Sequence, residues 1–191
     1  MNKKLIGSDY LLLLLYLNNA ESIRGAIRLT KMMFLFEKQI APALKAKGLD
    51  SYKLPDFISY NYGPFSRELY QQLELFKNIG FIDIEDINSD EELADVDNYI
   101  ENEFDEECFE VENEIKNENK FLNYTITNLG ASYVEKEILP VINDEQRMLL
   151  QRFKQKVVEM STKQLLYYVY TKYPDFTDKS LIKDEVLKNG N

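Results

Sequence analysis

The chain has 191 residues, of which 45% are hydrophobic and 13% aromatic, and its formal net charge is −10. This length and hydrophobicity are typical of one folded domain, with or without an appendage, and exclude a fully disordered chain. The sequence has no histidine and a single cysteine, Cys108, which excludes a structural zinc site, an internal disulfide and Ser/His/Asp or Cys/His catalysis. No glycine-rich phosphate-binding motif is present. We therefore expect a cytoplasmic, non-enzymatic protein with no cofactor and no metal.

The negative charge is concentrated in one part of the chain. Between Asp83 and Glu118 there are 17 acidic residues and one lysine, Lys116, which leaves 22 basic and 16 acidic residues in the remainder. The body of the protein is therefore mildly basic, and its net charge does not by itself argue against nucleic acid. The longest apolar run, 10–17, is far shorter than the roughly 20 residues that span a bilayer, so we expect no membrane partner.

The first expected element is a helix capped by Ser8, with Asp9 in its first turn, that runs through Leu17. Residues 11–15 are all leucine and cover every side of this helix, which predicts that it is buried on most sides. The polar pair 18–19 ends it.

A second helix is expected from about Ile27, after a turn at 24–25. Pro42 ends or kinks this helix and begins a short continuation to about Lys47, because proline lacks the N–H that an interior helical position needs.

Residues 57–82 carry the most information about architecture. An apolar strand over 57–60 precedes a Gly63-Pro64 corner, Ser66 is placed to cap a helix, and Gly80 is placed to end it. Residues 81–87 and 121–127 then alternate with period two, which predicts two half-buried strands that pair as a wing. The order of these elements is typical of a winged helix-turn-helix, a mostly α (α+β) fold, with a long acidic insertion over 88–119.

The expected helix over 65–79 has two distinct faces. At 100° per residue, Leu69, Leu73 and Phe76 share the core face. The opposite face holds Arg67, Gln71, Glu74 and Asn78, flanked by Tyr70 and Lys77. This pattern leaves two interpretations open: a recognition helix on DNA, or an ordinary solvated face. On DNA, Arg67, Gln71 and Asn78 would approach base edges, and Arg24, Arg28, Lys31 and Lys77 would contact phosphates.

The C-terminal part is expected to be helical. Thr127 caps a helix that ends at Pro140 and completes a body over 1–140. Residues 141–191 form a helical appendage, in which a capping box at 161–164 opens a helix to Lys172. The appendage would either pack on the body or form a homodimer.

Four stretches outside the acidic insertion carry a resemblance to a known family. They are Ile23-Arg-Gly25 with Leu29-Thr-Lys31-Met-Met-Phe34, Tyr62-Gly63-Pro64-Phe65-Ser66 with Glu68-Leu69, Tyr124-Thr-Ile-Thr127 with Gly130, and Leu165-Leu-Tyr-Tyr-Val-Tyr170 with Tyr173-Pro174 and Lys179-Ser180. At these residues the chain resembles the bacterial YwgA-like family and, more distantly, the Panacea domain of SocA-type antitoxins. The resemblance implies a small winged helix-turn-helix protein, and the Panacea members imply binding of a toxin protein.

Two functions follow from these expectations. The first is a winged-helix regulator, of the antitoxin or transcription-factor kind, that acts through the exposed helix over 65–79. The second is a protein-interaction module that does not bind nucleic acid, in which the segment 83–118 binds a basic partner such as a toxin, or mimics DNA. Its acidic partner surface would consist of Glu101, Glu103, Asp105, Glu106 and Glu107. A solubilising loop is the plain alternative for this segment, and an enzyme that holds magnesium through carboxylates is a third function.

Overall fold

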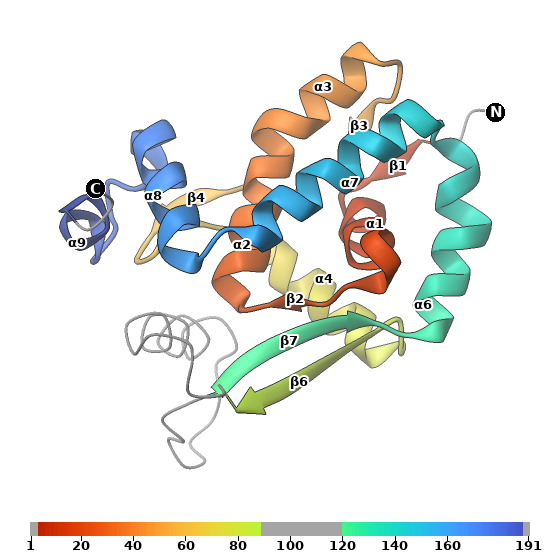
Figure 1. The fold of residues 1–191 in the computed structure, drawn as a ribbon, viewed down its shortest axis with the longest axis horizontal. Coiled ribbons are helices and arrows are strands. Elements are labelled where there is room, and N and C mark those ends of the chain that lie inside the picture. Colours follow the sequence, from red (N-terminus) through yellow and green to blue (C-terminus); the bar gives the residue numbers. More distant parts are fainter. Residues whose placement is uncertain (1–3, 89–119, 189–191) are drawn as a thin grey trace.

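The structure is a computed structural model that describes residues 4–88 and 120–188. These residues form a mostly helical molecule with three small β-sheets (Figure 1). In chain order the elements are β1 (Leu5–Ile6), α1 (Gly7–Ala20), β2 (Ile23–Arg24), α2 (Ala26–Leu35), a π-helical turn (Phe36–Ile40), α3 (Ala41–Ala46), β3 (Ser51–Tyr52), β4 (Ile58–Tyr60), β5 (Gly63–Phe65), α4 (Arg67–Asn78), β6 (Ile82–Asn88), β7 (Lys120–Ile126), α6 (Asn128–Tyr133), a second π-helical turn (Val134–Ile138), a 3-10 turn (Leu139–Val141), α7 (Asp144–Glu159), α8 (Thr162–Lys172), a 3-10 turn (Pro174–Phe176) and α9 (Lys183–Lys188).

Helix α1 lies at the centre of the molecule, where it contacts α7, β7 and the helix that begins with α6 (Figure 1). The leucines at 11–15 are each at most 1% exposed, which confirms that this helix is buried on most sides. The expected cap at Ser8 is wrong. The helix begins at Gly7 because the Asp9 carboxylate accepts the backbone N–H of Ile6 at 3.0 Å and so places the cap at Ile6.

The regular part of α1 ends where the sequence predicts. Leu17 has an extended backbone, and the next three residues, Asn18, Asn19 and Ala20, have positive φ. Asparagine tolerates this left-handed conformation better than most residues, which explains why the polar pair 18–19 ends the helix.

Helix α2 is continued by the π-helical turn and α3. Pro42 lies in the first turn of α3, and the N–H of Ala41 donates to the carbonyl of Phe36, five residues earlier. A wider turn just before a proline fits its missing N–H and its bulky ring. The short helix expected after Pro42 is therefore confirmed.

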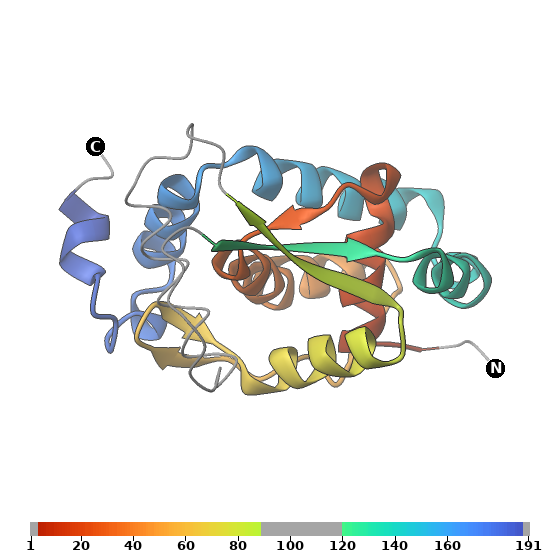
Figure 2. The ribbon, with the colours of Figure 1, turned by 90° about the horizontal axis from the view of Figure 1, so that it is seen from below.

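The largest sheet has three strands in the order β2-β7-β6, and both pairings are antiparallel. Strand β6 pairs with β7 from Ile82 opposite Ile126 to Asn88 opposite Lys120, which confirms the expected strand pair. Figure 2 shows the two strands crossing with a strong twist. Ile82 and Tyr124 are buried on one face, whereas Asp83 and Glu85 are exposed on the other.

The C-terminal helices share one core with the rest of the described chain. Helix α7 packs on α1 and α2, and α8 packs on α2. Their side chains Val157, Leu165 and Val169 are at most 2% exposed and belong to the same apolar cluster as the leucines of α1. The capping box that opens α8 is confirmed, because Ser161 and Gln164 each accept the other's backbone N–H.

Candidate interaction surface

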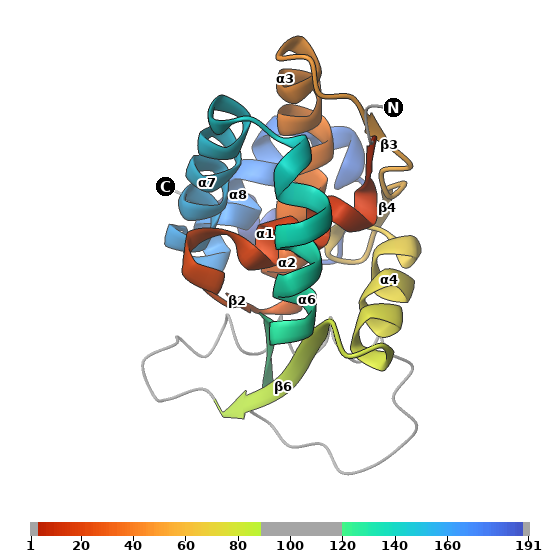
Figure 3. The ribbon, with the colours of Figure 1, turned by 90° about the vertical axis from the view of Figure 1, so that its right-hand side faces the viewer.

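Helix α4 is held at both ends by the local signals that the sequence contains. Ser66 Oγ accepts the N–H of Leu69, which caps the helix. At the other end Gly80 adopts φ +76°, a conformation that favours glycine, and its N–H donates to the carbonyl of Lys77. The chain then enters β6 directly, so α4 lies on the outside of the molecule next to the three-stranded sheet (Figure 3).

The outward face of α4 is the one that helical periodicity predicts. Leu69, Leu73 and Phe76 are buried. The exposed side chains are those of Arg67, Glu68, Gln71, Glu74, Lys77 and Asn78. This face carries two basic and two acidic groups, so its net charge is close to zero.

Two apolar side chains add to this surface, and sequence reasoning missed them. Leu75 is 55% exposed and Ile79 is 45% exposed, one helical turn apart on one flank of α4. Large side chains at such exposure leave apolar area open to solvent. The helical phase places both residues between the polar and the buried face, and this position is the signal in the sequence that could have pointed to them.

Tyr70 does not flank the outward face as expected. It is 6% exposed, its hydroxyl lies 2.6 Å from Thr30 Oγ1, and its ring stacks on that of Phe65. Its partners are Thr30 of α2 and Phe65 of β5, and the helical phase by itself does not contain these contacts.

The basic residues expected at phosphates take three different positions. Arg24 is exposed on β2, which lies on a different side of the molecule from α4 (Figure 3). Arg28 is partly buried, and its Nη1 donates to the carbonyl oxygens of Val157 at 2.9 Å and Val158 at 3.0 Å. It therefore caps the C-terminal end of α7, where helical carbonyls lack intrahelical partners.

The expectation for Lys31 is wrong. Its side chain is fully buried, and Nζ donates to the carbonyl oxygen of Pro64 at 3.0 Å. Helix α2 packs against β5 and α8, and Lys31 lies on its buried side. Lys31 cannot contact a phosphate in this fold.

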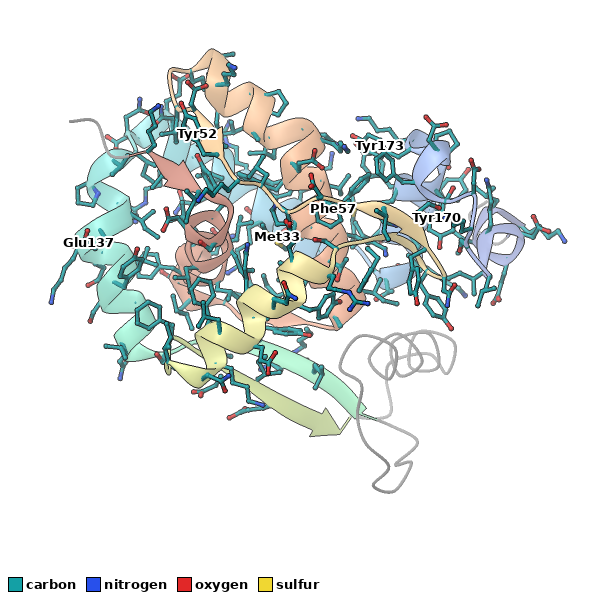
Figure 4. The ribbon with its side chains drawn as sticks, turned by 180° about the vertical axis from the view of Figure 1, so that it is seen from behind. Met33, Tyr52, Phe57, Glu137, Tyr170 and Tyr173 are labelled. Atoms are coloured by element: carbon teal, nitrogen blue, oxygen red, sulfur yellow. The ribbon has the colours of Figure 1, made fainter. Side chains whose placement is uncertain are left out.

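Buried and partly buried hydrogen bonds hold the β4–β5 hairpin that precedes α4. Besides the bond from Lys31 to Pro64, the Tyr170 hydroxyl lies 2.7 Å from Ser180 Oγ, which in turn donates to the carbonyl of Asn61 at 3.1 Å. Figure 4 shows Tyr170 beside the hairpin. Burial raises the pKa of Tyr170 to about 12, so its hydroxyl stays protonated.

Several residues that the sequence analysis connects only through the family resemblance lie together in this network. They come from α2, from the Gly63-Pro64 corner, from α8 and from the loop at Ser180, and long-range hydrogen bonds join them. These residues hold the hairpin that precedes α4 and do not form part of the outward face of α4.

The proposed acidic partner surface, Glu101, Glu103, Asp105, Glu106 and Glu107, lies outside the described residues. Within the described part of the chain, no three carboxylate or cysteine groups are placed to hold a metal ion. Across residues 4–88 and 120–188, no helix is long and apolar enough to cross a membrane.

Comparisons of the sequence and fold with protein-family models, curated proteins and solved structures gave no match. The geometry of α4, the hairpin and the three-stranded sheet therefore carries the functional argument.

Proposed function

We propose that this chain is a non-enzymatic, cytoplasmic winged-helix regulatory protein of the antitoxin-like kind, which binds a protein partner through the outward face of α4. The order of elements supports the winged-helix interpretation. Strand β2 lies between α1 and α2 in the chain, α4 leads into β6, and β6 and β7 are neighbours in the sheet order β2-β7-β6, as the two strands of a wing would be.

The exposure of Leu75 and Ile79 on α4 is the observation that favours a protein partner over DNA. Protein interfaces combine a small apolar centre with a polar rim, and Arg67, Gln71 and Asn78 would supply such a rim. Binding of DNA instead needs a net positive surface, because affinity comes largely from phosphate contacts. The charges on α4 cancel, and the neighbouring strand β6 exposes Asp83 and Glu85.

A comparative pull-down tests this function. The full chain is immobilised and exposed to lysate of its native host, together with a Leu75→Gln/Ile79→Gln variant. We expect a specific partner to be captured by the wild type and lost by the variant, because both substitutions remove apolar contact area at exposed positions. The matched control is Leu129→Gln/Met148→Gln, which alters two side chains of similar exposure, 57% and 48%, on α6 and α7.

Binding of duplex DNA is the test of the alternative function. Fluorescence anisotropy with a random-sequence duplex at low salt should show no binding that depends on α4. Tight, salt-sensitive binding that Arg67→Ala and Gln71→Ala weaken would instead make DNA the ligand and refute the proposal.

A further inference from the structure

Strand β6 is an edge strand whose outer hydrogen-bonding groups have no strand partner among the described residues. It is the last strand in the order β2-β7-β6. Native edge strands are commonly protected by charged side chains, by proline, by a bulge or by a covering element. The sequence of β6, Ile82–Asn88, contains no proline, lysine or glycine, and its charged residues are all acidic.

The register shows which backbone groups face this open edge. The N–H of Thr127 donates to the carbonyl of Phe81 at 3.0 Å. In an antiparallel ladder the hydrogen-bonded pairs alternate, so Asp83 and Glu85 bond to β7 through their backbones. The N–H and C=O groups of Ile84 and Asp86 therefore point away from β7. The bond from Gly25 N–H to the Leu122 carbonyl fits the same alternation on the far side of β7.

The charges on β6 select the kind of strand that can be added. Asp83 and Glu85 are both exposed on the solvent face of the sheet. In an added strand, the residues opposite Asp83 and Glu85 would have their Cβ atoms about 5 Å from those of the two acidic residues. A second copy of β6 would place acidic groups opposite acidic groups, which is unfavourable, whereas lysine or arginine at alternate positions would be paired.

We propose that the edge of β6 binds an extended, basic segment of a protein partner by strand addition. Backbone hydrogen bonds to Ile84 and Asp86 would supply affinity, and Asp83 and Glu85 would supply selectivity for lysine or arginine. The inference rests on the proposed function in that it names the chemistry of a partner segment, but it uses a surface separate from the outward face of α4.

The test uses the full chain and a fluorescein-labelled decapeptide in which lysine alternates with threonine. We expect saturable binding by anisotropy, and slower hydrogen exchange at the amides of Ile84 and Asp86 when the peptide is bound. Two further peptides carry N-methyl groups on the odd or on the even residues, which blocks one edge each without changing charge. At least one of them should bind about tenfold more weakly if backbone bonds are involved.

Charge selectivity is tested with Asp83→Lys/Glu85→Lys. This variant should bind the lysine peptide about tenfold more weakly and should gain binding of the equivalent glutamate peptide. Asp184→Lys/Glu185→Lys on α9 changes net charge by the same amount and should leave both peptides unaffected. Equal binding of all three lysine peptides would show capture by acidic side chains alone and overturn strand addition. Absence of any binding would overturn it as well.

The α4 variant Leu75→Gln/Ile79→Gln separates the two proposals. It should bind the lysine peptide like the wild type, since it leaves β6 unchanged. If this variant loses the pull-down partner but still binds the peptide, both proposals are supported. The pull-down can contradict the α4 proposal without affecting the β6 proposal, and the peptide assay can contradict the β6 proposal without affecting the α4 proposal.

Discussion

At the scale of single residues, Gly63 shows how a backbone position depends on a distant ring. Its φ is +84°, and a Cβ added to it would lie 2.9 Å from Cε2 of Tyr170. Glycine is therefore required twice, once for the backbone conformation and once for space. Tyr170 has no freedom to move aside, because its hydroxyl is bonded to Ser180 and its side chain is 1% exposed.

We expect Gly63→Ala to lower the free energy of unfolding by about 2–4 kcal/mol, from backbone strain and overpacking together. Gly48→Ala is the matched control, because Gly48 has a similar φ of +82° with no atom within 4 Å of an added Cβ. That control should cost only about 1 kcal/mol, the cost of the left-handed conformation. Urea denaturation measures both, and equal losses would contradict the contact with Tyr170.

Lys31 and Tyr70 show where residue-level reasoning from the sequence was limited. The sequence pattern predicts an accessible position for both, for Lys31 as a phosphate contact and for Tyr70 beside the outward face of α4. Each is instead buried against a residue that is distant in the sequence, Lys31 against Pro64 and Tyr70 against Thr30. No local pattern around either residue contains that information.

At the scale of elements, α7 is attached to the end of α1 by a buried lysine. Lys154 is fully buried, and its Nζ donates to the carbonyls of Leu17 at 2.7 Å and Glu21 at 2.6 Å, with Leu15 at 3.4 Å. These carbonyls become available because the left-handed residues after Leu17 end the regular helix. Burial lowers the pKa of Lys154 to about 8, and the Glu21 charge opposes this shift.

This shift predicts a pH dependence of stability. Between about pH 8 and pH 10.4 the unfolded chain keeps the lysine proton while the folded chain has lost it. The unfolded state then binds more protons, so the free energy of unfolding attributable to Lys154 rises with pH across this window. The burial cost of the ammonium is fully present below pH 8.

The measurement compares the wild type with Lys154→Met by urea denaturation from pH 7.5 to pH 9.5. We expect the wild type to gain about 1–2 kcal/mol relative to the variant across this range. The range stops below pH 10 because ionisation of tyrosines such as Tyr170 in the unfolded chain then lowers stability. Parallel curves for the two proteins would contradict the shifted pKa.

The element that carries the proposed function was largely predictable. The bounds of α4 follow from Ser66 and Gly80, and its buried stripe follows from the 3.6-residue period of a helix. The helical phase places Leu75 and Ile79 on the flank between the polar and the buried face, but it does not predict how exposed they are, because that depends on how far the neighbouring elements extend over this flank. The open edge of β6 likewise depends on the order of strands in the sheet, which pairing of 81–87 with 121–127 alone does not specify.

At the scale of the whole molecule, the described helices form one core. The expected division into a body over 1–140 and an appendage over 141–191 implied that the appendage packs on the body or pairs with a second chain. In the structure α7 and α8 cover α1 and α2, and Arg28 of α2 caps the end of α7. Leu150 and Val169 are buried with the leucines of α1.

We expect a chain that ends at residue 140 to lose its cooperative urea transition, because α1 and α2 would expose apolar side chains that α7 and α8 now cover. A chain that ends at residue 182 is the control. It lacks residues 183–191, and no residue of α9 is buried, so it should unfold cooperatively. Circular dichroism and tyrosine fluorescence report the transition, and a stable 1–140 fragment would contradict the shared core.

The sequence by itself determined the features that depend on neighbours a few residues away. Caps at Ser66, Thr127 and Ser161, the end of α1 at Leu17, the period-two strands and the phase of α4 all belong to this group. Only the tertiary structure decided which charged and aromatic side chains are enclosed, where α7 and α8 pack, and that β6 is an edge. The physical reason is range: caps and periodicity act within one or two turns, whereas burial joins residues such as Lys31 and Pro64, or Arg28 and Val157, that are distant in the chain.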